Sequence, residues 1–452
     1  QLSDVRPDHW AFEVLKAIDD RYNCLAGYPD GTFRGDRAVT RYEFAAALQA
    51  CIRINLDFAT QDDLEAVERL AQDFAEELEA LEEKVDRLDR ILPEPFSTTT
   101  VLQGQVTLAV ASYLGGGDPD PDEALDSQMV FSNRVDLTLL SSFGGKDQLR
   151  LRLRTRNAPS LSEIAETDMA RLAWEGDDAS NVEISGLEYR FPLGERATGY
   201  LFAVGGGLRK FSGDVGFAID PISRFGQGNP IYRQGGALGV GFNLELTDFA
   251  SLGVGYLADD PESAIGSDPY GTIVQLFFQP HERVALSLGY FYSYNNLDTN
   301  TGSDRANNPF RRRSDRVPAH SLAFETRFEV APKIILGGWL GWTQARALDL
   351  PGDPDAQLFT YAVTLGVLDA GGEGNVAGLV LGQPPRVFKN DFQVRGREYA
   401  DRDAAFHLEA FYTYRVTDNI ALTPGLIVVL NPEHDRDNAT LYLGAVRAVF
   451  RF

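Results

Sequence analysis

The chain has little of several residue types on which whole classes of protein depend. Of its 452 residues only two are cysteine and five are histidine, which excludes a disulfide-dense scaffold and leaves little for a histidine-based metal site. Its 42 lysines and arginines are outnumbered by 66 acidic residues, and a net charge of −24 argues against nucleic-acid binding, which needs a basic surface. No run of about 18 apolar residues occurs, so a membrane-spanning helix is excluded. Residues 1–4 lack the basic and then apolar order of a signal peptide, as expected of either a cytosolic or a processed chain.

Catalytic motifs are missing as well. The sequence contains no G-x-S-x-G, HExxH, CxxC or P-loop pattern, so we predict no enzymatic activity, no cofactor and no bound metal. None of these absences argues against a transmembrane β-barrel, because its strands alternate apolar and polar residues and its average composition is unremarkable. The 43 glycines and the 11% aromatic content are compatible with such a barrel.

The N-terminal residues predict a small helical domain. Apolar residues recur at helical spacing over 10–18 and again over 42–48. Between them, 27–33 reads Gly-Tyr-Pro-Asp-Gly-Thr-Phe, a strong turn sequence. Thr40 followed by Glu43 fits a capping box. The pattern therefore predicts a helix, a tight loop and a second helix.

The motifs of this domain resemble a single S-layer homology (SLH) repeat. They are Trp10 followed by alanine, the turn sequence that ends at Arg34, and Thr-Arg-Tyr-Glu-Phe around Arg41. The resemblance implies an SLH domain over 1–58 that binds peptidoglycan-linked polysaccharide, with Arg41 contacting acidic groups and Trp10 and Arg34 as further candidates. The alternative is structural, with Trp10 in the core and the Thr-x-x-Glu pair only capping a helix.

Both cysteines, Cys24 and Cys51, fall in this domain. A disulfide between them suits an oxidising compartment such as the periplasm. The alternative is a pair of buried thiols.

Residues 59–95 predict a coiled-coil stalk and linker. Apolar residues step by three and four through four heptads, the spacing of a coiled-coil seam. Pro93 and Pro95 then end the helix. The alternative is an amphipathic helix that lies on another domain, although such a helix usually has a wider apolar face. The seam residues are Leu64, Val67, Ala71, Phe74, Leu78, Leu81, Val85, Leu88 and Leu92.

From residue 96 onward the apolar period becomes two. In 148–156 four arginines alternate with leucines and a threonine, and in 406–415 aromatic and apolar residues alternate with polar and charged ones. One apolar and one charged face per strand is typical of a barrel with lipid outside and water inside. A soluble sandwich would carry less charge per strand and would need a second sheet. The sequence therefore predicts a mainly β fold, with an antiparallel transmembrane β-barrel over 96–452.

Sixteen strands are expected, the even number typical of a bacterial barrel. Short turns alternate with long loops, as periplasmic turns and outer loops do. Residues 169–174 are expected in a loop, because a strand there would break the up-and-down order. The expected strands are 98–112, 127–141, 147–157, 181–191, 197–207, 233–246, 249–258, 270–279, 283–295, 319–330, 333–345, 357–369, 376–382, 404–415, 419–430 and 439–452.

The whole chain resembles a known family of barrels. One SLH repeat, a coiled coil and a sixteen-stranded barrel together resemble the major outer-membrane porins of cyanobacteria, grouped with carbohydrate-selective (OprB-type) and iron-uptake porins. The resemblance implies a homotrimer in outer-membrane lipid, with the SLH domain and the coiled coil in the periplasm. The terminal Phe452 resembles the signal read by the barrel-assembly machinery.

This resemblance implies a function. We expect passive diffusion of small hydrophilic solutes, chiefly inorganic ions, and anchoring of the outer membrane to peptidoglycan. Two alternatives remain open: a carbohydrate-selective channel, and a mainly structural tether with an occluded barrel.

Four arginines on one face of a strand are the first pore-lining candidates. If that face lines the lumen, they form a ladder of positive charge with a spacing of about 6–7 Å, which lowers the barrier for anions. The alternative is that they pair with acids on neighbouring strands, such as Asp136 or Glu188, and only hold the wall together. The ladder comprises Arg150, Arg152, Arg154 and Arg156.

The loop over 208–232 is the candidate for the constriction, because sixteen-stranded porins commonly fold their third outer loop inward. The alternative is an ordinary surface loop. A second basic cluster, over 311–316, is expected on the surface. The acidic residues of 118–122 fail the EF-hand pattern, so we expect a solvated loop there. The charged candidates in the constriction loop are Arg209, Lys210, Asp214, Asp220 and Arg224.

Overall fold

The computed structural model describes residues 10, 11, 14, 44, 69–75, 100–115, 129–259 and 269–452. The chain divides into two compact units, Gln1–Thr98 and Thr99–Phe452.

Several predictions for the first unit fall outside the described residues. They include most of the expected coiled coil and, in the SLH domain, the side chains of Arg34, Arg41, Cys24 and Cys51. The cell-wall contacts of the two arginines and the disulfide therefore stay predictions.

The described helical residues of the first unit pack on its N-terminal part. Leu70 and Phe74 are fully buried, and the Phe74 ring stacks on Phe44 with 4.6 Å between ring centroids. The guanidinium of Arg69 lies 4.4 Å from the centre of the Trp10 ring, in a cation–π contact. Such packing is compatible with the alternative of an amphipathic helix for 69–75, and the coiled coil over 59–95 stays a prediction.

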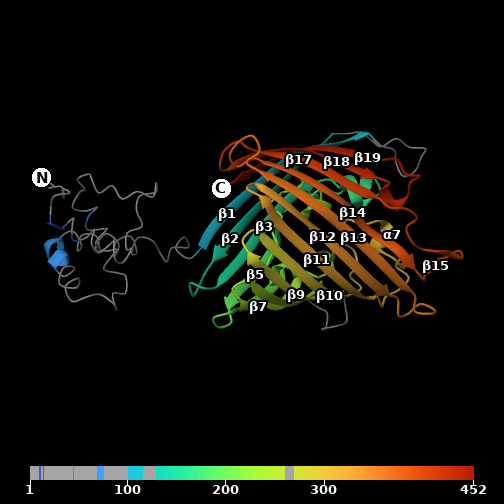
Figure 1. Cartoon of the computed structure of the whole chain (residues 1–452), viewed down its shortest axis with the longest axis horizontal. Coiled ribbons are helices and arrows are strands. Elements are labelled where there is room, and N and C mark those ends of the chain that lie inside the picture. Colours follow the sequence, from blue (N-terminus) through green and yellow to red (C-terminus); the bar gives the residue numbers. More distant parts are fainter. Residues whose placement is uncertain are drawn as a thin grey trace. The chain divides into compact units, whose positions relative to one another are not determined.

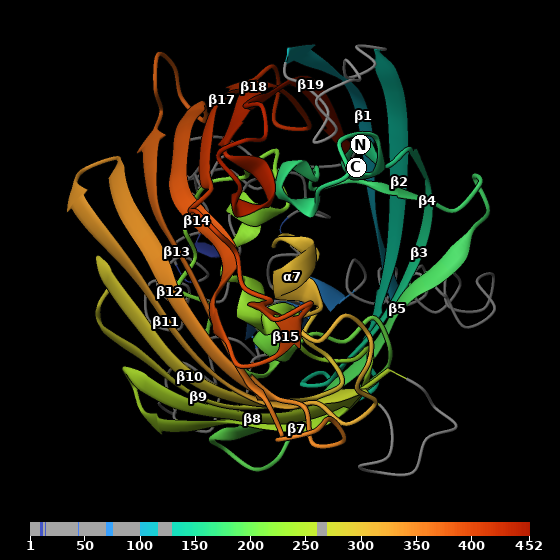
Figure 2. The same ribbon diagram turned by 90° about the vertical axis from the view of Figure 1, so that its right-hand side faces the viewer.

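Sixteen long strands of the second unit form one closed antiparallel sheet, in which β1 pairs with both β2 and β19 (Figures 1 and 2). The strands are β1 (Thr100–Gly115), β2 (Val130–Ser141), β3 (Gln148–Ala158), β5 (Glu183–Pro192), β6 (Ala197–Val204), β7 (Leu238–Thr247), β8 (Ala250–Ala258), β9 (Tyr270–His281), β10 (Val284–Tyr294), β11 (Pro318–Ala331), β12 (Ile334–Arg346), β13 (Asp355–Leu368), β14 (Val376–Asn390), β17 (Phe406–Arg415), β18 (Ile420–Leu430) and β19 (Leu441–Arg451).

Short elements occupy the connections between these strands. Residues 169–174 belong to a loop, as predicted, apart from one isolated bridge. Within the part of the chain that the structure describes, no helix is long and apolar enough to cross a membrane. The short elements are α6 (Leu161–Ile164), η1 (Asp168–Ala170), β4 (Gly176–Asp177), η2 (Leu208–Phe211), η3 (Phe225–Gln227), η4 (Pro230–Arg233), α7 (Asp304–Asn307), β15 (Gln393–Val394), β16 (Arg397–Glu398) and η5 (Pro432–His434).

The predicted sixteen-stranded barrel is confirmed, and most strand ends agree to within three residues. The prediction was wrong for β14, which continues to Asn390 instead of ending at Gly382. The added stretch contains Pro384 and Pro385, which have no backbone N–H to donate to a neighbouring strand. Beyond Gly382 the strand pairs with β13 alone, and shifts of register on that side absorb the prolines at a free strand edge.

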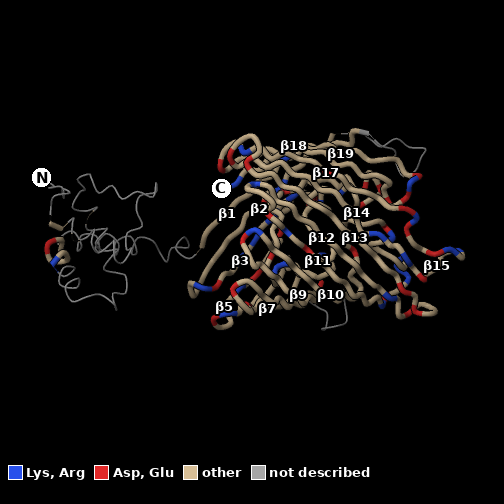
Figure 3. The backbone as a smooth tube through the Cα atoms, viewed as in Figure 1, with Lys and Arg blue, Asp and Glu red and all other residues tan. Residues whose placement is uncertain are grey.

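The faces of each strand differ as the alternation predicts. In β11, Leu322 and Phe324 are 48% and 38% exposed on the outer face, whereas Ala323 and Glu325 on the inner face are fully buried. Lysine, arginine, aspartate and glutamate are most frequent towards the two ends of the barrel, and other residues prevail along the strands between them (Figure 3). The exposed large apolar residues of these strands include Leu276, Leu340 and Leu381. An apolar outer wall is the surface that lipid requires.

One end of the barrel carries short turns, such as 193–196 and 282–283, and the other end carries the long loops. In bacterial barrels the short turns lie on the periplasmic side. Two long loops, 159–182 and 205–237, turn into the barrel, where their apolar residues form buried clusters with the inner wall.

Candidate pore constriction

The loop 205–237 joins β6 to β7 and lies inside the ring of strands, as its green segments in Figure 2 indicate. Its side chains and backbone contact strands on other sides of the barrel. They reach Glu325 of β11, Glu409 of β17 and Arg447 of β19. We call this segment the lumen loop.

Near its origin, the lumen loop is held by an aromatic side chain. Phe211 is fully buried and contacts Phe202 edge to face, with 5.4 Å between ring centroids. On the other side, its ring occupies the space that a Cβ atom would need at Gly241 of β7 and Gly255 of β8. The lack of side chains at these glycines lets the loop lie directly on the wall.

A partly buried ion pair also holds the lumen loop near its origin. The two terminal nitrogens of Arg209 donate to the two carboxylate oxygens of Glu325 at 2.8 and 2.6 Å. Glu325 is fully buried, and the Arg209 guanidinium lies 4.0 Å from the centre of the Tyr232 ring. A two-point contact of this kind fixes orientation as well as position.

The far part of the lumen loop is held by two strands at once. Oε1 of Glu409 accepts from the backbone amides of Ile222 and Ser223 at 2.5 and 3.2 Å, and Oε2 accepts from the Ser223 hydroxyl. The Arg447 guanidinium donates to the backbone oxygen of Asp220 and pairs with its carboxylate, both at 2.8 Å. Glu409 and Arg447 are almost fully buried, so the wall side of these contacts is shielded from bulk water, while the Asp220 carboxylate is exposed.

Most large aromatic residues of this region face the wall. Phe225 and Trp339 are almost fully buried, with 5.5 Å between their ring centroids, and Phe217 packs half-buried on the same tryptophan. Phe225 also lies 4.9 Å from the ring of His407. The rings therefore fill the space between the loop and β12.

The second inward loop, 159–182, supports the lumen loop from the side of β2. Trp174 donates through Nε1 to the hydroxyl of Ser132 at 3.1 Å. The two loops are linked by backbone hydrogen bonds, from Ala173 to Ile222 at 2.8 Å and from Arg224 to Arg171 at 2.7 Å. The contact with Ser132 also identifies the inward face of β2.

The four arginines of β3 share this inward face. β2 and β3 pair in register with Asp136 opposite Arg154, so Asp136, Ser132 and the arginines lie on one side of the sheet. Each arginine has an acidic residue within 4.0 Å: Glu188 for Arg150, Asp136 for Arg152 and Arg154, and Asp178 for Arg156. The structure therefore contains the alternative from the sequence analysis, in which the arginines pair with acids of neighbouring segments.

Pairing leaves an excess of positive charge on this wall. Asp136 accepts hydrogen bonds from Arg134 and Arg154 and is the closest acid to Arg152, so one carboxylate serves three guanidiniums. Glu188 is likewise shared, between Arg150 and a lysine of the lumen loop.

The other candidates of the lumen loop differ in their surroundings. Lys210 pairs with Glu188, Asp214 is more than half exposed beside Arg209, and Asp220 is similarly exposed beside Arg447. Within the described part of the chain, the guanidinium of Arg224 donates to the side-chain oxygen of Gln227 at 3.5 Å and pairs with no acid. Sequence reasoning missed Glu325, Glu409, Arg447 and Trp174, because nothing in a strand pattern indicates which inward residues a distant loop will contact.

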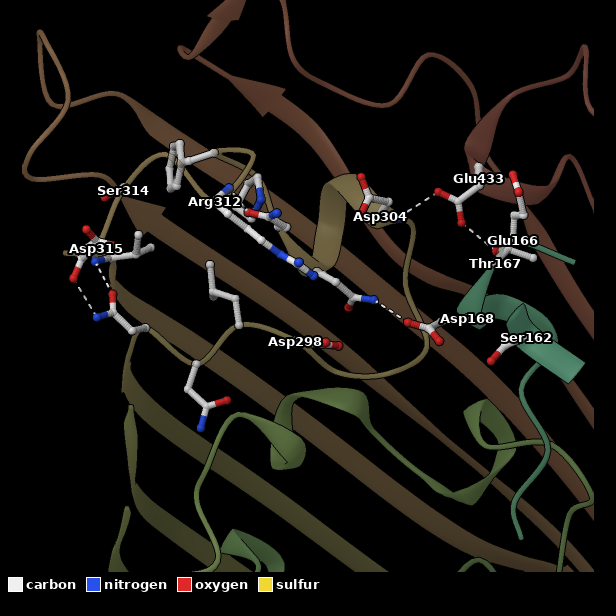
Figure 4. A pocket seen from close by; sticks show the side chains of 18 of the residues that line it. Ser162, Glu166, Thr167, Asp168, Asp298, Asp304, Arg312, Ser314, Asp315 and Glu433 are labelled. Carbon is white, nitrogen blue, oxygen red and sulfur yellow. Dashed lines mark hydrogen bonds between the residues drawn. The ribbon is translucent and has the colours of Figure 1, made fainter. Parts of the chain in front are cut away.

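The mouth at the long-loop end forms an acidic vestibule of about 590 Å³ (Figure 4). Three loops meet there at Glu433, whose Oε1 accepts from the Thr167 hydroxyl at 2.6 Å and whose Oε2 accepts from the Asp304 amide at 2.7 Å. The basic residues 311–313 are exposed, and Arg312 is itself among the residues that line the vestibule. Among the described residues, no three histidine, cysteine, aspartate or glutamate side chains are grouped to hold a metal ion. The acidic lining residues are Glu163, Glu166, Asp168, Asp298, Asp304, Asp315 and Glu433.

The contacts of Glu433 predict a pH dependence. Burial raises the pKa of Glu433 to about 7 and that of nearby Asp401 to about 6. The folded state thus holds protons that the unfolded chain releases near pH 4.5, so stability is lost as pH rises from there through 7. We expect a lower thermal midpoint, and faster proteolysis of the outer loops, at about pH 8 than at about pH 5.

The variant Glu433→Gln should reduce this difference between the two pH values, because it cannot release the proton. Glu163→Gln, an exposed residue of the same vestibule, is the matched control and should keep the wild-type difference. An unchanged pH response in Glu433→Gln would refute the role of this carboxyl.

Comparison with known proteins agrees with this architecture. Residues 92–452 match the OprB family of carbohydrate-selective porins, and residues 1–45 match the S-layer homology domain. An uncharacterized protein of Synechocystis sp. is 35% identical over 508 residues, covering 100% of this chain and 90% of the relative. One of Nostoc sp. is 32% identical over 505 residues, covering 100% and 84%.

Solved structures show the same fold. Pseudomonas putida OprB superposes with a TM-score of 0.55 at 12% identity, covering 79% of this chain and 96% of that one. Salmonella typhi OmpF superposes with a TM-score of 0.51, also at 12% identity, covering 78% and 97%. With a family match over the whole barrel and full-length relatives above 30% identity, the chain belongs to the OprB porin family and is an outer-membrane porin with an SLH domain.

Proposed function

We propose that this porin lets small hydrophilic solutes diffuse passively through a lumen narrowed by the lumen loop, and that inorganic anions are its preferred solutes. The SLH domain binds peptidoglycan-linked polysaccharide and so ties the outer membrane to the cell wall. The chain acts as a homotrimer in outer-membrane lipid. No nucleotide or conformational cycle is needed for such transport.

The observation that carries this proposal is the excess of guanidinium groups on the inner wall. Asp136 is shared by three arginines, and Arg224 of the lumen loop has no acid within ion-pair distance among the described residues. Fixed positive charge in a narrow, partly dewatered passage lowers the barrier for anions and raises it for cations. This wall therefore favours anions such as chloride.

Carbohydrate selectivity is the second candidate, because the family includes carbohydrate-selective porins. Sugar recognition usually needs aromatic rings that are exposed to the passage. In the lumen loop, Phe211 and Phe225 are buried against the wall and only Phe217 is half-exposed. These orientations favour ions over sugars as the solutes selected here.

Planar-bilayer recording of the purified protein tests the proposal. We expect ohmic current steps in potassium chloride, and in a salt gradient a reversal potential of the sign that chloride permeation produces. A lack of steps would instead support an occluded barrel that serves as a tether. A reversal potential of the opposite sign would overturn anion preference.

A further inference from the structure

A second cavity lies in the inner wall near the periplasmic end of the barrel. Its volume is about 650 Å³, and it is formed where β1, β2 and β3 meet the end of β19. Four arginine side chains and one acidic side chain line it, so the lining side chains carry a net positive charge. The inward lining residues are Gln103, Gln105, Arg134, Asp136, Thr138, Arg150, Arg152 and Arg451.

We propose that this cavity binds a divalent tetrahedral oxyanion, of the phosphate or sulfate type, as it passes through the lumen. This proposal deepens the anion preference proposed above and rests on it. The cavity would be a discrete anion-binding site. The rest of the positively charged wall would attract anions without binding them at one place.

Two arginines of the cavity have guanidinium N–H groups that are not fully used by protein acceptors. Arg451 is exposed and makes no ion pair or side-chain hydrogen bond among the described residues. Arg150 reaches Glu188 only at 3.5 Å, and that carboxylate is already bound by Lys210. A guanidinium group with free N–H donors can donate two parallel hydrogen bonds to two oxygens of one anion.

The other two arginines are positioned in advance. Arg134 donates to Asp136 at 2.6 Å, and Arg152 donates to the Ser185 hydroxyl and backbone oxygen at 2.9 and 2.8 Å. These bonds hold the guanidiniums without neutralising the cavity, because Asp136 is the one acidic side chain among the lining residues. An anion that enters therefore meets a cluster of charge that is already ordered, which lowers the entropic cost of binding.

The size and chemistry of the lining select the class of anion. Alternate residues of a strand are about 6–7 Å apart, so Arg150 and Arg152 can contact different oxygens of one anion. Gln103, Gln105 and Thr138 add neutral donors. A dianion gains from each additional guanidinium, whereas chloride carries one charge and has no separate oxygens to share among them.

The test is a block experiment on single channels, with current carried by chloride at about pH 8, where phosphate is mostly doubly charged. Inorganic phosphate, sulfate or gluconate is added to both chambers, so that the direction of insertion does not matter. We expect phosphate and sulfate to reduce the chloride current saturably at millimolar concentrations. Gluconate, a monovalent anion, should act only at much higher concentrations.

The double variant R150Q/R451Q should raise the concentration of phosphate needed for half-block at least about tenfold, since each tenfold change corresponds to about 1.4 kcal/mol. R196Q, in the exposed turn between β5 and β6, is the matched control and should behave as wild type. R451Q alone provides a milder variant, because Arg451 makes no ion pair that its loss would break in the described part of the chain.

Two outcomes separate this inference from the proposed function. If chloride steps appear but phosphate fails to block saturably, or blocks wild type and double variant alike, the discrete anion-binding site is overturned while the anion channel stands. If the chloride steps themselves are missing, the proposed function fails.

Discussion

Replacing Arg209 with methionine is expected to destabilise the barrel by about 3–5 kcal/mol, the usual cost of leaving a buried charge without its partner. Glu325 is fully buried and receives both of its strong hydrogen bonds from this guanidinium. Methionine fills much of the same volume but donates nothing. We therefore expect a much lower thermal midpoint for the loss of β-sheet circular dichroism in detergent.

A double variant distinguishes the effect of losing the ion pair from the effect of losing side-chain packing. Arg209→Met combined with Glu325→Leu removes both charges, and well-packed apolar replacements of buried ion pairs are often neutral or stabilising. We expect this variant to recover most of the wild-type midpoint. Arg283→Met is the matched control, because Arg283 is 59% exposed and meets Glu329 only at 3.9 Å. Such a surface pair is worth at most about 1 kcal/mol.

If Arg209→Met and Arg283→Met had similar midpoints, the buried pair would not be stabilising the lumen loop.

Replacing Glu409 with alanine is expected to release the far part of the lumen loop. The carboxylate accepts from Ile222 and twice from Ser223, and hydrogen bonds to a charged group contribute about 1.5–3 kcal/mol each. Even a net loss of about 3 kcal/mol raises the population of the detached loop about a hundredfold. In single-channel records we expect a second, larger conductance level and frequent transitions to it.

Glu409→Gln is the control for this experiment. Its amide oxygen can still accept from the two backbone amides, so the record should stay close to wild type. A steady single level in the alanine variant would show that Arg447 and the wall packing are enough to hold the loop.

Much of the barrel could be predicted because its strands are local patterns. The pairing of Arg154 with Asp136 could be anticipated as well, since β2 and β3 are joined by a short turn that sets their register. The extension of β14 could not, because Pro384 and Pro385 have the composition of a turn and are tolerated only at a strand edge that is left unpaired.

The contacts of Glu325 and Glu409 with the lumen loop could not be predicted, because they depend on how distant parts of the chain pack. The alternation places Glu325 and Glu409 on the inward faces of their strands, yet it gives no reason to connect them with a loop that is 96 to 187 residues away. The path of the lumen loop follows from packing, such as Phe211 on the glycines of β7 and β8, and packing partners are not encoded in a periodicity.

The attachment of the lumen loop to β19 also constrains the order of folding. Asp220 and Arg447 are 227 residues apart, and β19 is the strand that closes the barrel against β1. Contacts of such long sequence separation form late, because a large loop must be closed before they contribute any stability. The contact between the lumen loop and β19 can therefore form only as the last strand joins, whereas its contacts with β7, β8 and β11 do not involve that strand.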